Sequence, residues 1–121
     1  MSYSIFISIS HQTLTLISNE QNSAVQTRCY SVSSGLNGVG NEKNSGKTPL
    51  GHHQVRAKIG HNAPINTVFI GRRATGEIYD ESLALNYPQR DWILTRILWL
   101  SGKEVGVNRL GNVDTMQRYI Y

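Results

Sequence analysis

The residues that first suggest chemistry lie between Gly38 and Gly51, in the stretch GVGNEKNSGKTPLG. This stretch nearly matches the phosphate-binding loop G-x-x-x-x-G-K-[ST], because residues 46–48 supply the closing Gly-Lys-Thr. The first glycine of that loop would have to stand at position 41, which is an asparagine. A phosphate-binding loop also opens a helix at its lysine, whereas Pro49 follows the threonine here. The pattern therefore predicts a mobile surface loop and no nucleotide site.

A nucleophilic reaction needs an activated side chain, and Cys29 is the one cysteine of the chain. It lies in the alternating run QTRCYSV, where the neighbouring Arg28 would point to the opposite face of a strand. A reactive thiolate needs an exposed setting with positive charge close by. The sequence therefore predicts an inert, packed cysteine. Nor is SVSSG, at residues 31–35, a nucleophile elbow of the G-x-S-x-G type.

The histidines and acids form no recognisable metal site or acid–base pair. His52 and His53 are adjacent, so on a strand their side chains diverge, and no third ligand stands at metal-site spacing. Asp80 and Glu81 precede a short apolar segment, where helix capping and solvation are the expected roles. No metal and no cofactor are predicted, and these residues alone supply no self-contained catalytic set.

The elements that would position these residues are mostly strands. Residues 3–10, 13–18 and 24–34 alternate between polar and apolar types, which predicts a three-stranded meander. Further strands are expected over residues 53–60 and 66–72. A single strand buried on both faces is favoured over residues 91–102, with a helix as the lesser alternative, and a last strand begins at residue 116. Residues 81–86 are expected to form a short helix that Asp80 caps and Pro88 ends.

Length and composition indicate one globular domain over residues 1–121. The net charge is +4, but the basic residues are scattered and Arg72-Arg73 is their one adjacent pair, so no nucleic-acid partner is expected. The N-terminus has no Lys or Arg ahead of an apolar run, which argues against a signal peptide. No stretch reaches the length of a transmembrane helix, so no membrane partner and a cytoplasmic location are expected.

Several segments, taken in order, resemble the YkuD-type L,D-transpeptidase domain, also called ErfK/YbiS-like. In that family a V-S-x-G turn precedes a T-P-x-G loop, as in YSVSSGLNGVG and SGKTPLGHHQV here. The resemblance continues through NTVFIGR, GEIY, DWILTRILWLSG and RLGNVDTMQRYIY. It implies a mainly β, mixed β-sandwich-like fold with one short helix. It also implies acyl transfer at the L-centre of diaminopimelate in the tetrapeptide stem of peptidoglycan, with a cysteine nucleophile and a histidine base.

The family's His-Gly and Ser-His-Gly-Cys-x-Arg motifs do not occur in the chain. We expect both motifs, and the closing strands, beyond Tyr121, so residues 1–121 are interpreted as the N-terminal portion of such a domain, inactive alone. No position is assigned to the catalytic Cys or His, and Cys29 is no substitute. Arg96, facing a substrate carboxylate, Tyr119 and Tyr121 are the predicted substrate-binding residues. The unfinished last strand is expected to leave an exposed edge open to self-association.

The expected location selects among the reactions of the family. In the cytoplasm a polymeric wall is absent, so hydrolysis of the terminal D-Ala from recycled muropeptides is favoured over cross-linking. L,D-carboxypeptidase activity is therefore the first hypothesis, and transpeptidation stays open. The alternative hypothesis is a non-catalytic relative that binds muropeptide or an anionic partner. Steep salt dependence of binding would mark the anionic partner.

Overall fold

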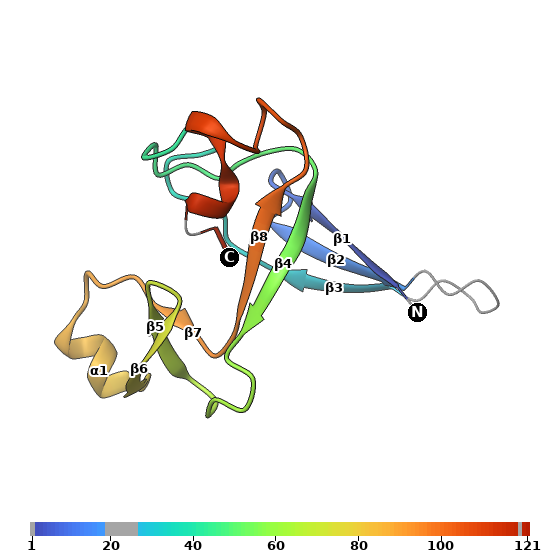
Figure 1. Ribbon diagram of the computed structural model, residues 1–121. Helices are drawn as coiled ribbons and strands as arrows, with labels where there is room; N and C mark the ends of the chain where they lie inside the picture. Colours follow the sequence, from blue (N-terminus) through green and yellow to red (C-terminus); the bar gives the residue numbers. More distant parts are fainter. Residues whose placement is uncertain (1, 19–26, 119) are drawn as a thin grey trace. The chain divides into compact units, whose positions relative to one another are not determined.

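A computed structural model describes residues 2–18, 27–118, 120 and 121 of the chain (Figure 1). The chain forms two compact units, Met1–Gly38 and Val39–Tyr121. Strands dominate the described residues, and α1 (Glu81–Asn86) is their one α-helix. The predicted mainly β fold with one short helix is therefore confirmed. No helix in these ranges is long and apolar enough to cross a membrane.

The first unit is a three-stranded antiparallel sheet in the order β1-β2-β3. Its strands are β1 (Tyr3–Ser8), β2 (Thr13–Ser18) and β3 (Thr27–Ser31), which confirms the predicted meander. Residues 24–26 of the predicted third strand lie outside the described residues. The β1–β2 turn is held by the Gln12 side chain, whose Nε2 donates to the Ile9 carbonyl oxygen at 2.7 Å. Strand β1 ends at Ser8, two residues before its predicted end at residue 10. The turn that follows contains Gln12, whose backbone has a φ of 52°.

Alternation along these strands divides their side chains between two faces. The strand register places one set of mainly apolar residues together: Tyr3, Ile5, Ile7, Leu14, Leu16, Arg28 and Tyr30. The opposite face is rich in hydroxyls: Ser4, Phe6, Ser8, Thr13, Thr15, Ile17, Thr27, Cys29 and Ser31. None of the described residues of this unit is buried. A three-stranded sheet of this kind contributes little apolar burial by itself.

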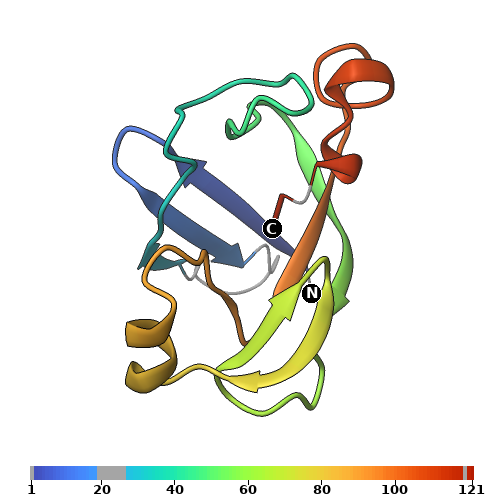
Figure 2. The ribbon, with the colours of Figure 1, turned by 90° about the vertical axis from the view of Figure 1, so that its left-hand side faces the viewer.

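The second unit contains two small antiparallel sheets. In the first, β4 (His53–Ile59) pairs with β8 (Ile97–Gly102). In the second, β5 (Thr67–Ile70) lies between β6 (Arg73–Ile78) and β7 (Ile93–Leu94). The second sheet and α1 come between β4 and β8 in the sequence, and Figure 2 shows them as a lobe at one end of the β4–β8 pair. The buried apolar side chains Val68, Phe69 and Ile97 come from β5 and β8, so both sheets share this small core.

The segment DWILTRILWLSG was predicted as one strand, and this prediction is wrong. The chain breaks at Thr95, whose φ of 70° is costly for a β-branched residue. Thr95 still donates its N–H to the Thr67 carbonyl oxygen of β5 at 2.9 Å, next to the last paired residues of β7 and β5. The chain then enters β8 and pairs with β4 in the other sheet. Because β7 and β8 both alternate, the hydrophobic pattern of the sequence does not change at Thr95 and does not indicate the break.

The short helix agrees with its prediction in both bounds and cap. Asp80 Oδ1 accepts a hydrogen bond from the Leu83 N–H at 2.7 Å, and the helix spans Glu81–Asn86. Two other elements differ from expectation. Strand β6 was missed, because Gly76 and its polar neighbours obscure the alternation. The predicted last strand is instead a 3-10 turn at Thr115–Gln117, which follows another at Gly111–Val113.

The C-terminal turn forms because long-range hydrogen bonds hold the backbone there. The Thr115 N–H donates to the Asn108 carbonyl oxygen at 2.9 Å, and Trp99 Nε1 donates to the Met116 carbonyl oxygen at 3.0 Å. Residues 120 and 121 are not in a strand. The edge that was predicted to mediate self-association is therefore not formed by the described C-terminal residues.

Candidate functional site

The T-P-x-G loop, residues 48–51, is closed by the side chain of Asn41. Its Nδ2 donates to the Leu50 carbonyl oxygen at 3.1 Å and to the Val107 carbonyl oxygen at 2.8 Å. Its Oδ1 accepts from the Leu50 N–H at 3.1 Å. One amide thus satisfies both backbone groups of Leu50, and Pro49 beside it is buried. The asparagine at the position where a phosphate loop requires glycine therefore has a structural role of its own.

The last residue of the motif must be glycine for two reasons. Gly51 has a φ of 98°, a conformation that side chains rarely adopt. A Cβ added there would lie 2.3 Å from Glu104 Oε2 and 2.9 Å from Asn108 Nδ2. That same Glu104 oxygen accepts a hydrogen bond from the His52 N–H at 2.8 Å. The carboxylate therefore occupies the space that a side chain at position 51 would need.

Asn108 is fully buried and connects three segments. Its Nδ2 donates to the Leu50 carbonyl oxygen at 3.1 Å and to the His52 carbonyl oxygen at 3.0 Å. Its Oδ1 accepts from the Glu104 N–H at 3.0 Å. A Cβ on Gly102 would lie 2.1 Å from the Asn108 carbonyl oxygen, so β8 must end in a glycine. Asn108 therefore anchors the T-P-x-G loop to the end of β8.

Arg118 holds the other side of the same loop. Its Nη1 donates to the Gly40 carbonyl oxygen at 3.1 Å, and its Nη2 donates to the Lys47 carbonyl oxygen at 2.7 Å. Partial burial removes water from the guanidinium and lowers the pKa of Arg118, which still leaves it charged at neutral pH. Lys43 Nζ also donates to Gln117 Oε1. The loop between Gly40 and Gly51 is thus tied down, which differs from the mobile loop predicted from its composition.

His53 is engaged on both ring nitrogens. Nδ1 lies 3.0 Å from the Gly51 carbonyl oxygen, which can only accept, so Nδ1 carries a proton. Nε2 lies 2.9 Å from Oγ1 of the fully buried Thr115, which donates to it when the ring is neutral. Because Thr115 is buried, the pair offers substrate no accessible hydroxyl. His53 therefore connects the T-P-x-G loop to the C-terminal turn.

Cys29 is exposed, so the prediction of a packed cysteine is wrong. It lies at the centre of β3, all five residues of which are exposed. Its sulfur accepts a long hydrogen bond from Thr15 Oγ1 at 3.9 Å, across the β2–β3 pair. The alternating pattern identified the strand, but it could not show that the hydroxyl-rich face is accessible.

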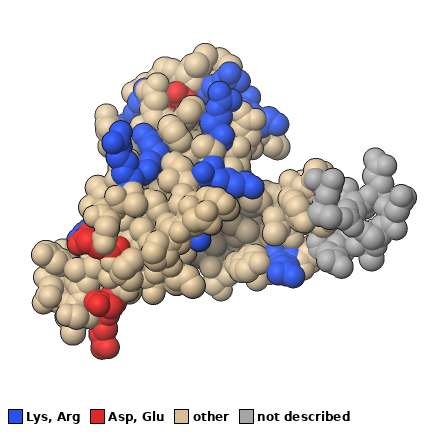
Figure 3. Space-filling view, turned by 60° about the horizontal axis from the view of Figure 1, so that its bottom comes forward, with Lys and Arg blue, Asp and Glu red and all other residues tan. Residues whose placement is uncertain are grey.

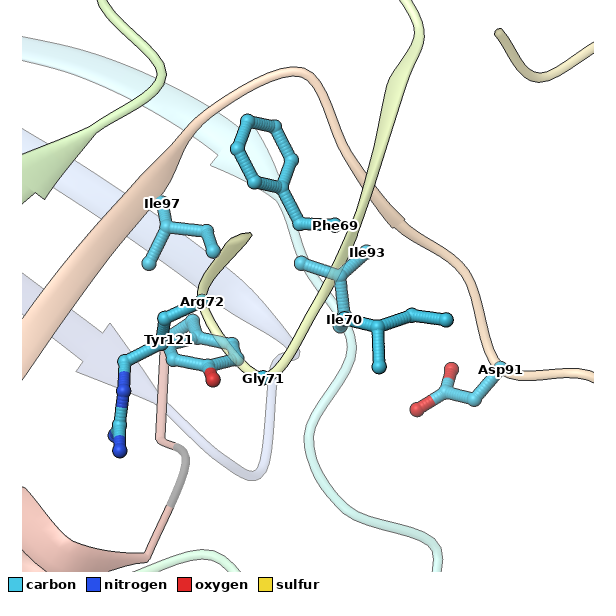
Figure 4. Close-up of a pocket in the computed structure, with 8 residues that line it drawn as sticks. All are labelled: Phe69, Ile70, Gly71, Arg72, Asp91, Ile93, Ile97 and Tyr121. Atoms are coloured by element: carbon cyan, nitrogen blue, oxygen red, sulfur yellow. The ribbon is translucent and has the colours of Figure 1, made fainter. Parts of the chain in front are cut away.

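A pocket of about 240 Å³ lies in the second unit (Figure 4). Apolar side chains form much of its wall, with an arginine and an aspartate among its lining residues: Phe69, Ile70, Gly71, Arg72, Asp91, Ile93, Ile97 and Tyr121. Figure 4 shows the Tyr121 ring beside the turn at Gly71 and Arg72, with the Asp91 carboxylate on the other side. The Arg72 guanidinium also lies over the Trp99 ring, with Cζ 4.1 Å from the ring centre.

The pocket contains one of the three predicted substrate-binding residues. Tyr121 lines it, whereas Tyr119 lies outside the described residues. Arg96 does not line it: its Nη1 donates to the Thr95 carbonyl oxygen at 2.7 Å and to the Ala63 carbonyl oxygen at 3.0 Å. Sequence reasoning missed Arg72 and Asp91. The turn signal at Gly71 was visible, but the approach of the chain end to that turn depends on tertiary structure.

A second polar cluster stabilises the inserted lobe. Arg90 forms a two-pronged ion pair with Glu77, with N–O distances of 2.5 and 3.1 Å. The hydrogen bonds from Arg90 lower the pKa of Glu77, and the same pair raises the pKa of Arg90. The guanidinium also lies over Trp92, with Cζ 4.5 Å from the ring centre, and Tyr79 meets Trp92 edge-on at 5.1 Å. These contacts orient the chain between α1 and β7.

Positive charge is unevenly distributed within the second unit. Residues 39–60 and 97–121 carry seven Lys or Arg against three Asp or Glu, whereas residues 61–96 carry four of each. In Figure 3, several groups of Lys and Arg side chains lie on the upper part of the visible surface, with an acidic side chain between them, and other acidic side chains lie at the lower left. The segments that carry the T-P-x-G loop therefore present the positive surplus. Such a surplus attracts ligands rich in carboxylates.

The mainly β fold and the anchored T-P-x-G loop agree with the result of a comparison with protein families. A sequence model of the YkuD family, described as the L,D-transpeptidase catalytic domain, matches residues 2–119. The chain belongs to this family, and the match extends across both units. A search of curated proteins and a search of solved structures found no match. Membership implies cysteine acyltransferase chemistry on peptidoglycan peptides.

Proposed function

We propose that the protein acts as an L,D-carboxypeptidase on soluble muropeptides in the cytoplasm. The reaction is acyl transfer at the L-centre of diaminopimelate in the tetrapeptide stem, with water as the acceptor and D-Ala as the leaving group. Family membership over residues 2–119 carries this proposal. The anchored T-P-x-G loop supports it, because the side chains of Asn41 and Asn108 hold the family's signature segment in the second unit.

The reaction requires an activated nucleophile and donors for the oxyanion. A thiolate attacks the amide carbonyl, the amine of D-Ala leaves with a proton from the histidine, and water then hydrolyses the thioester. We propose that Cys29 is not that thiolate, because it lies outside a Ser-His-Gly-Cys-x-Arg motif and its sulfur accepts a hydrogen bond from the Thr15 hydroxyl. We propose that the catalytic Cys and His lie beyond Tyr121, because residues 1–121 contain neither a His-Gly nor a Ser-His-Gly-Cys-x-Arg motif.

The 121 residues are proposed to contribute substrate binding. The pocket at Tyr121 combines apolar walls with Arg72 and Asp91, which suits a peptide that carries both charges. The positive surplus near the T-P-x-G loop suits the carboxylates of a stem peptide. Roles for Arg96 and Tyr119 in substrate binding stay predictions.

The test is release of D-Ala from free tetrapeptide, measured by mass spectrometry. Sequencing the gene past the Tyr121 codon determines whether the two missing motifs follow, and a protein that includes them is compared with residues 1–121. We expect turnover from the longer protein, with Cys29→Ala leaving its rate unchanged. Residues 1–121 alone are expected to release none. Both reactions release D-Ala when the thioester forms, so the second product distinguishes them: a cross-linked dimer in place of free tripeptide would refute the carboxypeptidase assignment. Loss of turnover in Cys29→Ala would refute the assignment of the nucleophile.

A second candidate is binding without turnover, which the positive surplus near the T-P-x-G loop favours. It predicts that residues 1–121 bind muropeptide or an anionic polymer, and that the gene encodes no product longer than these residues. Calorimetry at two salt concentrations separates the ligands, because binding to a polyanion weakens steeply with salt. A stop codon directly after Tyr121, together with measurable binding, would favour this candidate over the enzyme.

A further inference from the structure

The outer edge of β3 is an unpaired strand edge in the first unit. β3 pairs with β2 on one side, and among the described ranges no strand pairs with its other side. All five of its residues are exposed. An exposed edge of this kind offers backbone N–H and C=O groups to another strand. The sequence of β3 indicates which strand would fit.

We propose that β3 pairs antiparallel with β3 of a second copy of this chain, about a two-fold axis that passes through Cys29. An isologous interface requires a self-complementary surface. β3 has five residues, TRCYS, so its central residue Cys29 faces itself in this register. Arg28 of each copy then faces Tyr30 of the other, and Thr27 faces Ser31.

The side chains favour this register over its neighbours. Arg28 and Tyr30 lie on the same face of β3, and residues directly opposite in an antiparallel pair also share a face. Each arginine can therefore lie against a tyrosine ring of the other copy in a cation–π contact. A shift of the register by two residues would instead place Arg28 opposite Arg28, which is repulsive. The proposed pairing thus separates the like charges and also places each arginine opposite a tyrosine.

Pairing would also relieve a weakness of the first unit. None of its described residues is buried, and a small sheet is stable by itself only when three or more strands share an apolar face or pack against another element. Joining two copies through β3 produces one six-stranded sheet in the order β1-β2-β3-β3-β2-β1. The mainly apolar faces that carry Leu14, Leu16 and Tyr30 become continuous across the two copies. The interface therefore extends beyond the backbone hydrogen bonds of one strand pair.

Cys29 supplies a reporter of this geometry. Residues directly opposite in an antiparallel pair have Cα atoms roughly 4.5–5.5 Å apart. A disulfide spans Cα separations of about 4.4–6.8 Å, so the two Cys29 side chains lie within bonding distance in either type of pair. A mild oxidant such as diamide accepts the two electrons and two protons that the thiols lose. Oxidation should therefore trap the dimer.

The experiment treats the 121-residue chain with diamide at several concentrations and resolves it on a non-reducing gel. We expect a reducible band at twice the monomer mass of 13.5 kDa. The matched control is the double variant Cys29→Ser, Thr15→Cys. Thr15 faces Cys29 from the central strand β2, so its thiol is one strand further from the edge. An equal yield of dimer from this control, or a monomeric wild type, would overturn the proposal.

A charge exchange tests the register. Arg28→Glu removes both cation–π contacts, and we expect dimerisation to weaken by about five- to thirtyfold in sedimentation equilibrium. Adding Tyr30→Arg to that variant restores an attractive pair across the axis and should recover dimerisation. Failure of this rescue, with circular dichroism unchanged in both variants, would refute the register. None of these variants alters a residue placed in the substrate pocket, so the outcome is independent of the proposed enzyme activity.

Discussion

Replacement of Asn108 by alanine should destabilise the protein more than any other single amide truncation near the T-P-x-G loop. The side chain is fully buried and makes three hydrogen bonds, to the Leu50 and His52 carbonyl oxygens and from the Glu104 N–H. Each such bond contributes about 1 kcal/mol net, so Asn108→Ala should cost about 3 kcal/mol or more. The additional cost arises because the Glu104 N–H loses its bond and a fully buried side chain is removed, whereas the Leu50 and His52 carbonyl oxygens keep bonds from Asn41 Nδ2 and the Lys103 N–H.

The assay is thermal unfolding followed by circular dichroism, with Asn112→Ala as the matched control. Asn112 is exposed, and its backbone carbonyl oxygen accepts a hydrogen bond from the Lys43 N–H, which the substitution leaves in place. The control should change stability by less than about 0.5 kcal/mol. For a chain of this size, a loss of 3 kcal/mol lowers Tm by roughly 10–15 °C. Equal shifts in the two variants would refute the reasoning, because burial and bonding would then not decide the effect.

Three other substitutions test the same structure. Gly51→Ala should lower Tm more than Gly106→Ala does. Both glycines have positive φ, but only at position 51 would the added Cβ approach a carboxylate closely, so equal losses in Tm would contradict this explanation. Glu77→Gln should be less stable than wild type above pH 4.5, because the pKa of Glu77 is lowered in the folded state. The difference in Tm between the two proteins should shrink as pH falls, and a difference that grows in acid would count against the Arg90 ion pair. Arg118→Lys should speed amide exchange in the loop it holds, measured by mass spectrometry, and unchanged exchange would exclude that role.

Local sequence signals predicted the elements that depend on local physics. The alternation in residues 3–18 identified the first hairpin, because an exposed antiparallel sheet needs few distant contacts. The cap at Asp80 identified α1, because its hydrogen bond closes within three residues. The break at Thr95 was invisible, because it accompanies a bond to the distant Thr67 and the entry of β8 into another sheet.

The candidate site depended more strongly on distant contacts. Asn41 and Val107 are 66 positions apart, and Arg118 and Gly40 are 78 apart, so composition predicted mobility where long-range bonds give order. The pocket arises in the same way, because Gly71 and Tyr121, which are far apart in the sequence, both line it. A single sequence contains no local mark of such pairs. Only the resemblance to a family pointed to this part of the chain.

The structure also explains why a T-P-x-G match indicates a fold more directly than a reaction. Gly51 is required by its positive φ and by Glu104 and Asn108, and Leu50 is held through backbone groups that any residue possesses. The constraints on the loop are therefore steric and backbone constraints, and they leave the third position of the motif free. A relative that lost its nucleophile would keep the same motif for the same reasons. Evidence for catalysis must consequently come from the nucleophile and its base, which is why D-Ala release and the Cys29→Ala variant carry the functional test.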